Sequence, residues 1–92
     1  MNGFKYIRSK LLNKTMDELA SQLDVSKQAI YMWENDKKNM SELRLKQLSE
    51  LSGIPKKYFL IEELSEKDKL LIKQCYLIKE LYDTIVKLDN LL

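Results

Sequence analysis

Apolar residues recur at helical spacing through most of this 92-residue chain, and the clearest repeat begins after Thr15. Thr15 and Glu18 stand three residues apart, which is the spacing of a capping box that satisfies free amides at a helix start. The apolar face of the helix that follows consists of Leu19, Ala20 and Leu23. This pattern predicts a short helix that ends near residue 24.

A second short helix is predicted directly after the first, beyond a tight turn. Asp24 accepts a left-handed backbone conformation at small cost, and Ser26 is a suitable N-cap for the next helix. The inward residues of that helix are Ala29, Ile30 and Trp33, and its outer face carries Lys27, Gln28, Tyr31 and Met32. Asn35 is expected to end it in the left-handed conformation. Two helices joined by so short a turn are typical of a helix-turn-helix.

Three further helices are predicted around this pair. One precedes it, beginning near Phe4, with apolar residues at helical spacing. Another begins at the N-cap Ser41 and ends at Gly53, and Pro55 then starts a final short helix. The expected apolar positions of the helix after Ser41 are Leu43, Leu45, Leu48 and Leu51. The sequence thus predicts an all-α fold in which residues 1–61 form a five-helix domain.

Residues 62–92 form a different kind of segment, which contains neither Gly nor Pro. One stripe, spaced alternately by three and four residues, comprises Leu71, Gln74, Ile78, Leu81, Ile85, Leu88 and Leu92. This heptad spacing predicts a long amphipathic dimerisation helix that pairs with a second copy of the chain, with Gln74 fixing the register. The alternative is that the helix folds back onto its own domain.

The composition excludes several classes of protein. The sequence has no signal peptide and no apolar run near the roughly 20 residues that a membrane span needs. The chain holds one cysteine, Cys75, and no histidine, which argues against a disulfide, a metal site and a His-based catalytic triad. We therefore expect a cytoplasmic protein that is not an enzyme, with no cofactor and no evident small-molecule ligand.

Positive charge is concentrated in the N-terminal part of the chain. Residues 1–60 hold 11 Lys and Arg against 7 Asp and Glu, whereas residues 61–92 hold 5 against 7. A basic excess in the predicted helix-turn-helix part is what a phosphate-facing domain requires. Ordinary solubilising charge is an equally good explanation for an excess of this size, so the charge supports the motif and does not replace it.

The run VSKQAIYMWENDKK, followed by a Leu-rich helix and then LSGIPKKYFL, resembles the Cro-type phage repressors and the xenobiotic-response-element (XRE) regulators. The resemblance extends from about Phe4 to Leu60 and implies a phage-repressor-like DNA-binding domain. It implies that the second helix of the motif reads base edges through Lys27, Gln28, Tyr31 and Met32. Gln28 can hydrogen-bond adenine and Lys27 can hydrogen-bond guanine. An exposed and merely solvated helix face is the alternative for the same residues.

The resemblance also implies contacts with the DNA backbone. The candidate residues are Lys14, Ser26, Lys37, Lys38 and Asn39. Family members commonly have a phosphate-binding Gln where this chain has Met16, and Lys14 is the obvious substitute. Arg44 and Lys46 are further candidates for phosphate contacts.

A structural ion pair follows from the same resemblance. In the family, an Arg of the first helix often pairs with a Glu near the end of the reading helix. Arg8 and Glu34 are the matching residues in this chain. The alternative is that Arg8 is a solvated surface charge.

These features together predict a transcriptional regulator that binds double-stranded DNA. We expect it to act as a sequence-specific repressor and as a homodimer on a palindromic operator. The alternative is a protein-interaction module, such as an antitoxin-like or inhibitor subunit, that binds a different protein through the C-terminal helix. The candidate partners are thus duplex DNA, a second copy of the chain, and a protein anti-repressor or toxin.

Overall fold

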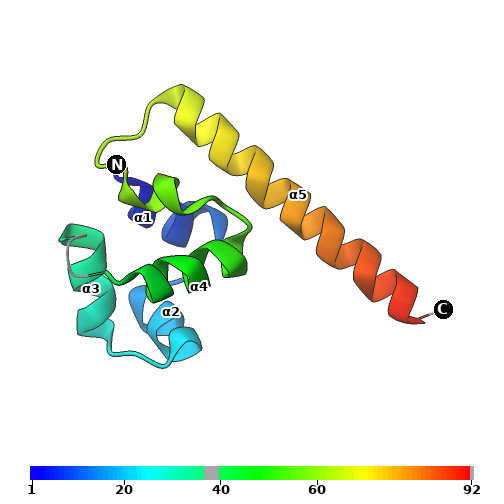
Figure 1. Cartoon of the computed structure of the whole chain (residues 1–92), viewed down its shortest axis with the longest axis horizontal. Helices are drawn as coiled ribbons and strands as arrows, with labels where there is room; N and C mark the ends of the chain where they lie inside the picture. Colours follow the sequence, from blue (N-terminus) through cyan, green and yellow to red (C-terminus); the bar gives the residue numbers. More distant parts are fainter. Residues whose placement is uncertain (37–39, 92) are drawn as a thin grey trace.

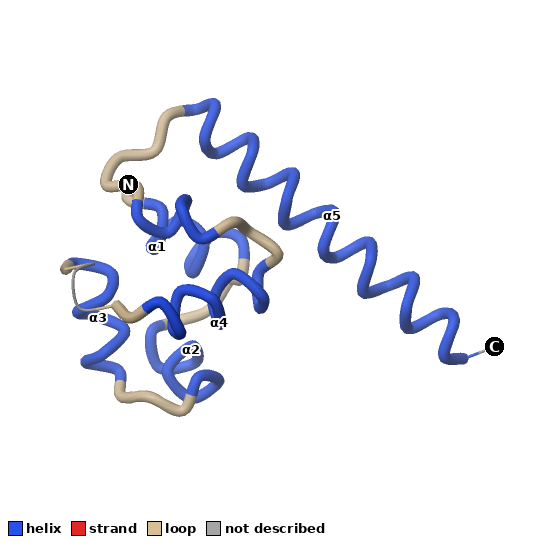
Figure 2. Tube along the Cα trace, viewed as in Figure 1, coloured by secondary structure: helices blue, strands red, loops and turns tan. Residues whose placement is uncertain are grey.

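The computed structural model describes residues 1–36 and 40–91 as a cluster of short helices followed by one long helix (Figure 1). In chain order the elements are α1 (Gly3–Tyr6), η1 (Ile7–Leu11), α2 (Met16–Leu23), α3 (Lys27–Asn35), α4 (Glu42–Ser52), η3 (Lys56–Leu60) and α5 (Glu66–Leu91). Every element found in this described part of the chain is a helix (Figure 2). The predicted all-α fold, with a helix-turn-helix domain and a long C-terminal helix, is confirmed.

The first and fifth predicted helices are not regular α-helices. The first consists of α1 and its wider continuation η1, which is π-helical and ends where the amide of Leu12 donates to the carbonyl of Ile7 at 2.9 Å. The link to α2 then passes through Asn13 in the left-handed conformation. The fifth, η3, is a 3-10 helix, and Pro55 is its N-cap and not its first residue.

The core of the domain lies where α1, η1, α2, α3, α4 and η3 meet. Phe4 and Phe59 pack edge to face at its centre, with ring centroids 6.0 Å apart. The other residues buried there include Ile7, Leu19, Ala20, Ile30, Trp33, Met40, Leu45, Leu48, Ile54 and Tyr58. Leu43 is not among them, because 64% of its surface is exposed, so its predicted inward position in α4 is wrong.

The helix ends follow from short-range chemistry. Thr15 and Glu18 form the predicted capping box, with hydrogen bonds of 3.0 and 3.1 Å in the two directions. The hydrogen bond from the Thr15 amide is the main cause that lowers the pKa of Glu18. Asp24 ends α2 with φ +56°, which is the expected left-handed turn. Asn35 does not end α3 in that way: it is the last helical residue, and Asp36 after it has extended backbone.

The first turns of α5 pack against the domain, and the rest of α5 extends beyond it (Figure 1). Ile72 is fully buried in the core, and Cys75 and Tyr76 pack beside it. The core therefore extends past Ile61, the last residue of the predicted N-terminal domain. The division of the chain at that point stays a prediction.

The approach of α5 to the C-terminal end of α4 is close at Gly53. This residue has φ +74°, a conformation that suits glycine. A Cβ at this position would also lie 2.5 Å from the Cβ of Lys79 in α5. Position 53 therefore requires glycine for two reasons: it ends α4 in the left-handed conformation, and it leaves room for the side-chain stem of Lys79.

Candidate nucleic-acid interface

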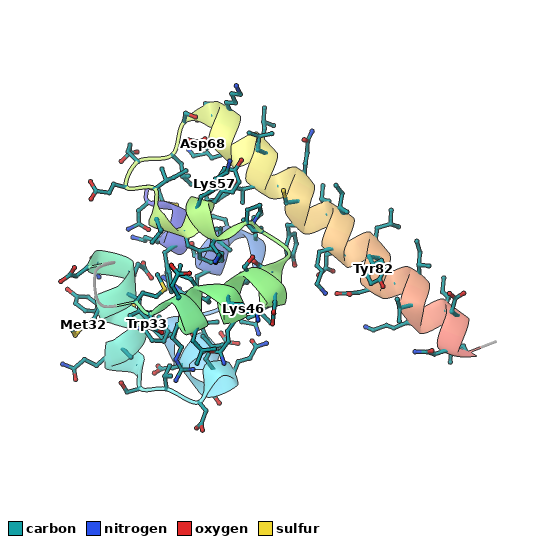
Figure 3. The ribbon with its side chains drawn as sticks, in the orientation of Figure 1. Met32, Trp33, Lys46, Lys57, Asp68 and Tyr82 are labelled. Atoms are coloured by element: carbon teal, nitrogen blue, oxygen red, sulfur yellow. The ribbon has the colours of Figure 1, made fainter. Side chains whose placement is uncertain are left out.

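Helix α3 turns one side toward the core and the other toward solvent. Ile30, Trp33 and Glu34 are the buried residues of α3. The outer side carries the predicted base-reading residues Lys27, Gln28, Tyr31 and Met32, all of them exposed. Figure 3 shows Met32 pointing away from the domain and Trp33 on the side of α3 that faces α4. The structure therefore brings the four predicted reading residues together on one accessible face.

The start of α3 is fixed by the turn that precedes it. The amide of Val25 donates to the carbonyl of Ala20 at 2.9 Å, which folds the chain back after α2. The hydroxyl of Ser26 accepts a hydrogen bond from the amide of Ala29 at 3.1 Å. Ser26 is therefore the N-cap of α3, and its backbone remains near the exposed first turn.

The end of α3 is held by a buried ion pair. Arg8 Nε donates to one carboxylate oxygen of Glu34 at 3.0 Å, and a terminal nitrogen donates to the other at 3.3 Å. The second terminal nitrogen donates to the carbonyl of Lys14 at 2.8 Å. The side chains of Arg8 and Glu34 are only 10% and 4% exposed. The pair implied by the resemblance thus ties η1, the link before α2 and the end of α3 together.

Two residues that hold α3 had no recognisable signal in the sequence. Asn2 caps α1 through its side-chain oxygen and donates from Nδ2 to the carbonyl of Glu34 at 2.9 Å. Arg44 of α4 lies over the ring of Trp33, with its guanidinium carbon 5.8 Å from the ring centroid. It also donates to the carbonyl of Leu23 at the end of α2, at 3.4 Å. Arg44 thus joins α2, α3 and α4, and its predicted phosphate contact stays a prediction.

The predicted reading residue Lys27 has an acidic neighbour that sequence analysis missed. Its ammonium nitrogen lies 3.6 Å from a carboxylate oxygen of Asp17, in the first turn of α2, and both side chains are mostly exposed. Lys14, a predicted backbone contact, is half-buried just before that turn, and Met16 packs against the core. The other predicted backbone contacts, Lys37, Lys38 and Asn39, lie outside the described residues.

The predicted seam of α5 is exposed along its whole described length. Exposure of its apolar members ranges from 37% at Leu71 to 68% at Ile78, and Gln74 is exposed as well. The other members are Leu81, Ile85 and Leu88, while Leu92 lies outside the described residues. Large apolar residues beside the seam, Leu70, Leu77, Tyr82 and Leu91, are also exposed. Figure 3 places Tyr82 on the part of α5 beyond the domain.

A family model described as a helix-turn-helix domain matches residues 4–70, from α1 to the first turn of α5. The chain belongs to the helix-turn-helix family of XRE-type regulators. It is therefore a DNA-binding domain of the kind found in transcription regulators. The match includes α2, the turn and α3, and it stops before most of the seam. No curated protein and no solved structure matches the chain.

Within residues 1–36 and 40–91, the helices are too short or too polar to cross a membrane. The same residues include no group of three or more Cys, Asp or Glu side chains that could hold a metal ion.

Proposed function

We propose that this protein is a cytoplasmic, sequence-specific transcriptional repressor that binds a palindromic operator as a homodimer. The observation that carries the proposal is the outer face of α3, where Lys27, Gln28, Tyr31 and Met32 gather on an exposed helix of an XRE-type domain. A helix in this position of a helix-turn-helix enters the major groove. Selection of bound fragments from random duplex DNA tests it, and a recurrent palindrome is the expected result.

Each residue of the outer face has a chemical role in this proposal. Gln28 hydrogen-bonds N6 and N7 of adenine, and Lys27 reaches guanine or a phosphate. Met32 touches a thymine methyl group, and Tyr31 hydrogen-bonds a phosphate or packs against a sugar. Lys14 and Ser26, together with the loop residues Lys37, Lys38 and Asn39, are proposed to contact the DNA backbone.

Replacement of Gln28 by alanine is expected to weaken specific binding by about 1–3 kcal/mol, because the bidentate contact with adenine is lost. Specificity should relax at one base pair of each half-site. Fluorescence anisotropy with a selected duplex and with its single-base variants measures both effects. The matched control is Gln22→Ala, which removes an exposed glutamine of α2. Equal affinities for Gln28→Ala, Gln22→Ala and the unchanged protein would remove Gln28 from the reading residues.

Replacement of Asp17 by asparagine is expected to raise the affinity for DNA by about threefold to tenfold at low salt. The carboxylate lies 3.6 Å from Lys27 and would repel nearby phosphates. An exposed pair of this kind contributes at most about 1 kcal/mol to stability, so the fold should persist. Anisotropy titrations at several salt concentrations measure the change, which should shrink as salt rises. Glu62→Gln, which neutralises an exposed carboxylate after η3, is the control; an equal gain there would contradict a local effect.

The stripe of α5 supports the homodimer. Full burial of a Leu or Ile side chain contributes roughly 1.5–3 kcal/mol, and those of the seam are about half exposed in one chain. Ten such side chains, five from each copy, would therefore contribute about 10 kcal/mol, comparable with an association cost of about 4–15 kcal/mol. The flanking residues Leu70, Leu77 and Tyr82 add to the favourable side. Pairing also doubles the phosphate contacts. For a dimer that neutralises about 6–8 phosphates, the slope of the logarithm of the binding constant against the logarithm of the salt concentration is expected to be around −5 to −7.

The same stripe favours a second candidate function. An antitoxin-like or inhibitor subunit would use it to bind a different protein, such as a toxin or an anti-repressor. Sedimentation of the purified chain separates the two functions, because a homodimer at micromolar concentration leaves the stripe covered by a second copy. A monomer that ignores every selected duplex would favour the protein-interaction module.

A further inference from the structure

We propose that two copies of the chain pair through α5 in parallel and in register, so that Gln74 of one copy faces Gln74 of the other. This inference rests on the homodimer of the proposed function and specifies how the two helices run.

The face of α5 that contacts the domain differs from the seam. Ile72 is fully buried and Tyr76 packs on the core, while the stem of Lys79 lies against Gly53. Lys69, on the same side, lies 6.0 Å from the ring centroid of Tyr6. At 3.6 residues per turn, these residues centre roughly 170° away from the seam around the helix. A second copy can therefore cover the seam while both domains stay seated on their own α5.

The order of residues along the seam fits a two-stranded parallel coiled coil. Taken as a heptad repeat, the first core position holds Leu71, Ile78 and Ile85, and the second holds Gln74, Leu81 and Leu88. In parallel coiled coils, a β-branched residue at the first position with Leu at the second favours two strands over three or four. The two layers of α5 farthest from the domain, Ile78 with Leu81 and Ile85 with Leu88, have this arrangement.

Gln74 separates the two orientations most clearly. In a parallel pair in register, the two Gln74 amides meet across the axis, where one can donate to the other. In the antiparallel register that overlaps α5 most completely, Gln74 of each copy faces Ile85 of the other. Its amide would then be buried against an apolar side chain without a partner, which is unfavourable.

The positions beside the seam agree with the parallel arrangement. In parallel, Leu77 of one copy lies beside Tyr82 of the other, and Leu70 lies beside Cys75, which also packs on the core of its own domain. In the antiparallel register described above, Asp68 of one copy lies beside the residue at position 89 of the other, which is also an aspartate. That contact occurs twice, and the like charges repel each other.

Disulfide trapping of the full chain tests the orientation. In a background with Cys75→Ser, the variant Leu88→Cys is incubated with oxidised glutathione. Parallel pairing in register is expected to yield a covalent dimer on a non-reducing gel, because the two cysteines face each other. The control Asn90→Cys places the thiol on the far side of α5 and is expected to remain monomeric on the gel. Leu88 is exposed in one chain, so its replacement should leave the domain folded, which circular dichroism checks.

A mixture of a tagged Leu71→Cys variant with Leu88→Cys reports on the opposite orientation. Antiparallel pairing brings residues 71 and 88 of different copies together, and a dominant tagged–untagged product without the 88–88 product would overturn the inference. Antiparallel trapping with normal binding to a selected duplex would overturn the orientation alone. An 88–88 product from a protein that binds no duplex would support the orientation and contradict the proposed function. Absence of any product, from a chain that sediments as a monomer, would overturn both the orientation and the homodimer.

Discussion

Replacement of Arg8 by alanine is expected to lower the free energy of unfolding by about 3–5 kcal/mol, because Glu34 would be left buried without its partner. The carboxylate of Glu34 is 4% exposed and loses two hydrogen bonds, and the carbonyl of Lys14 loses a third. In a domain of this size the melting temperature should fall by at least about 12 °C. Urea unfolding followed by circular dichroism measures the change.

Two further variants serve as controls for Arg8→Ala. Lys56 and Glu42 form an exposed ion pair, with 3.1 Å between the ammonium nitrogen and the carboxylate oxygen. Lys56→Ala breaks this pair and should lower the free energy of unfolding by at most about 1 kcal/mol. The double variant Arg8→Met with Glu34→Leu replaces both charges by apolar side chains and should recover much of the lost stability. A cost for Arg8→Ala no greater than that for Lys56→Ala would contradict the structural role of the buried pair.

The helix boundaries were predictable from the sequence where a few neighbouring residues decide them. The capping box at Thr15, the N-cap at Ser26 and the left-handed Gly53 each depend on hydrogen bonds or backbone angles within one turn. Such interactions require no knowledge of the tertiary fold. The prediction for Asn35 was wrong because α3 continues through this residue, and Asp36 after it has extended backbone.

The parts that sequence analysis missed depend on how helices cross in space. Ile72 lies on the far side of a strong seam, and its burial depends on where α5 begins after η3. Leu43 and Leu45 both lie in α4, but only one of them faces the core. Arg44 has the charge of a phosphate contact, and only the packing of α2, α3 and α4 turns it toward Trp33.

In the candidate interface, too, helical spacing predicted one part, and contacts between different helices could not be predicted. The outer face of α3 follows from helical spacing and from the resemblance, so its four predicted residues could be grouped before the structure was known. The approach of Asp17 to Lys27 could not be predicted, because the two residues belong to different helices and meet only through the angle of the turn. The side chain of Asn2 reaches the end of α3 for a comparable reason. The periodicity of apolar residues predicts which face of a helix is exposed. It gives little information about which residues of other helices lie beside that face.

Replacement of Leu81 by glutamate is expected to convert the proposed homodimer into a monomer and to weaken binding to a selected palindromic duplex by about 10²–10⁴-fold. Leu81 is 63% exposed in one chain, so the substitution should leave the domain folded. In the paired state it would place two like charges in the middle of an apolar seam. Two linked reading helices bind far more tightly than one, and this advantage is lost with pairing. Sedimentation measures the mass, and anisotropy measures the affinity for the full palindrome and for a single half-site.

The control is Asn90→Glu, which adds the same charge to the far side of α5 and should change neither the mass nor the affinity. A mixture of Leu81→Glu with Leu81→Lys supplies a sharper test, since a parallel pair in register sets the opposite charges against each other. That mixture is expected to recover dimer mass and a large part of the affinity, whereas each variant alone should not. Undiminished binding of the palindrome by monomeric Leu81→Glu would mean that α5 does not join two reading helices, and the exposed stripe would then belong to a different partner.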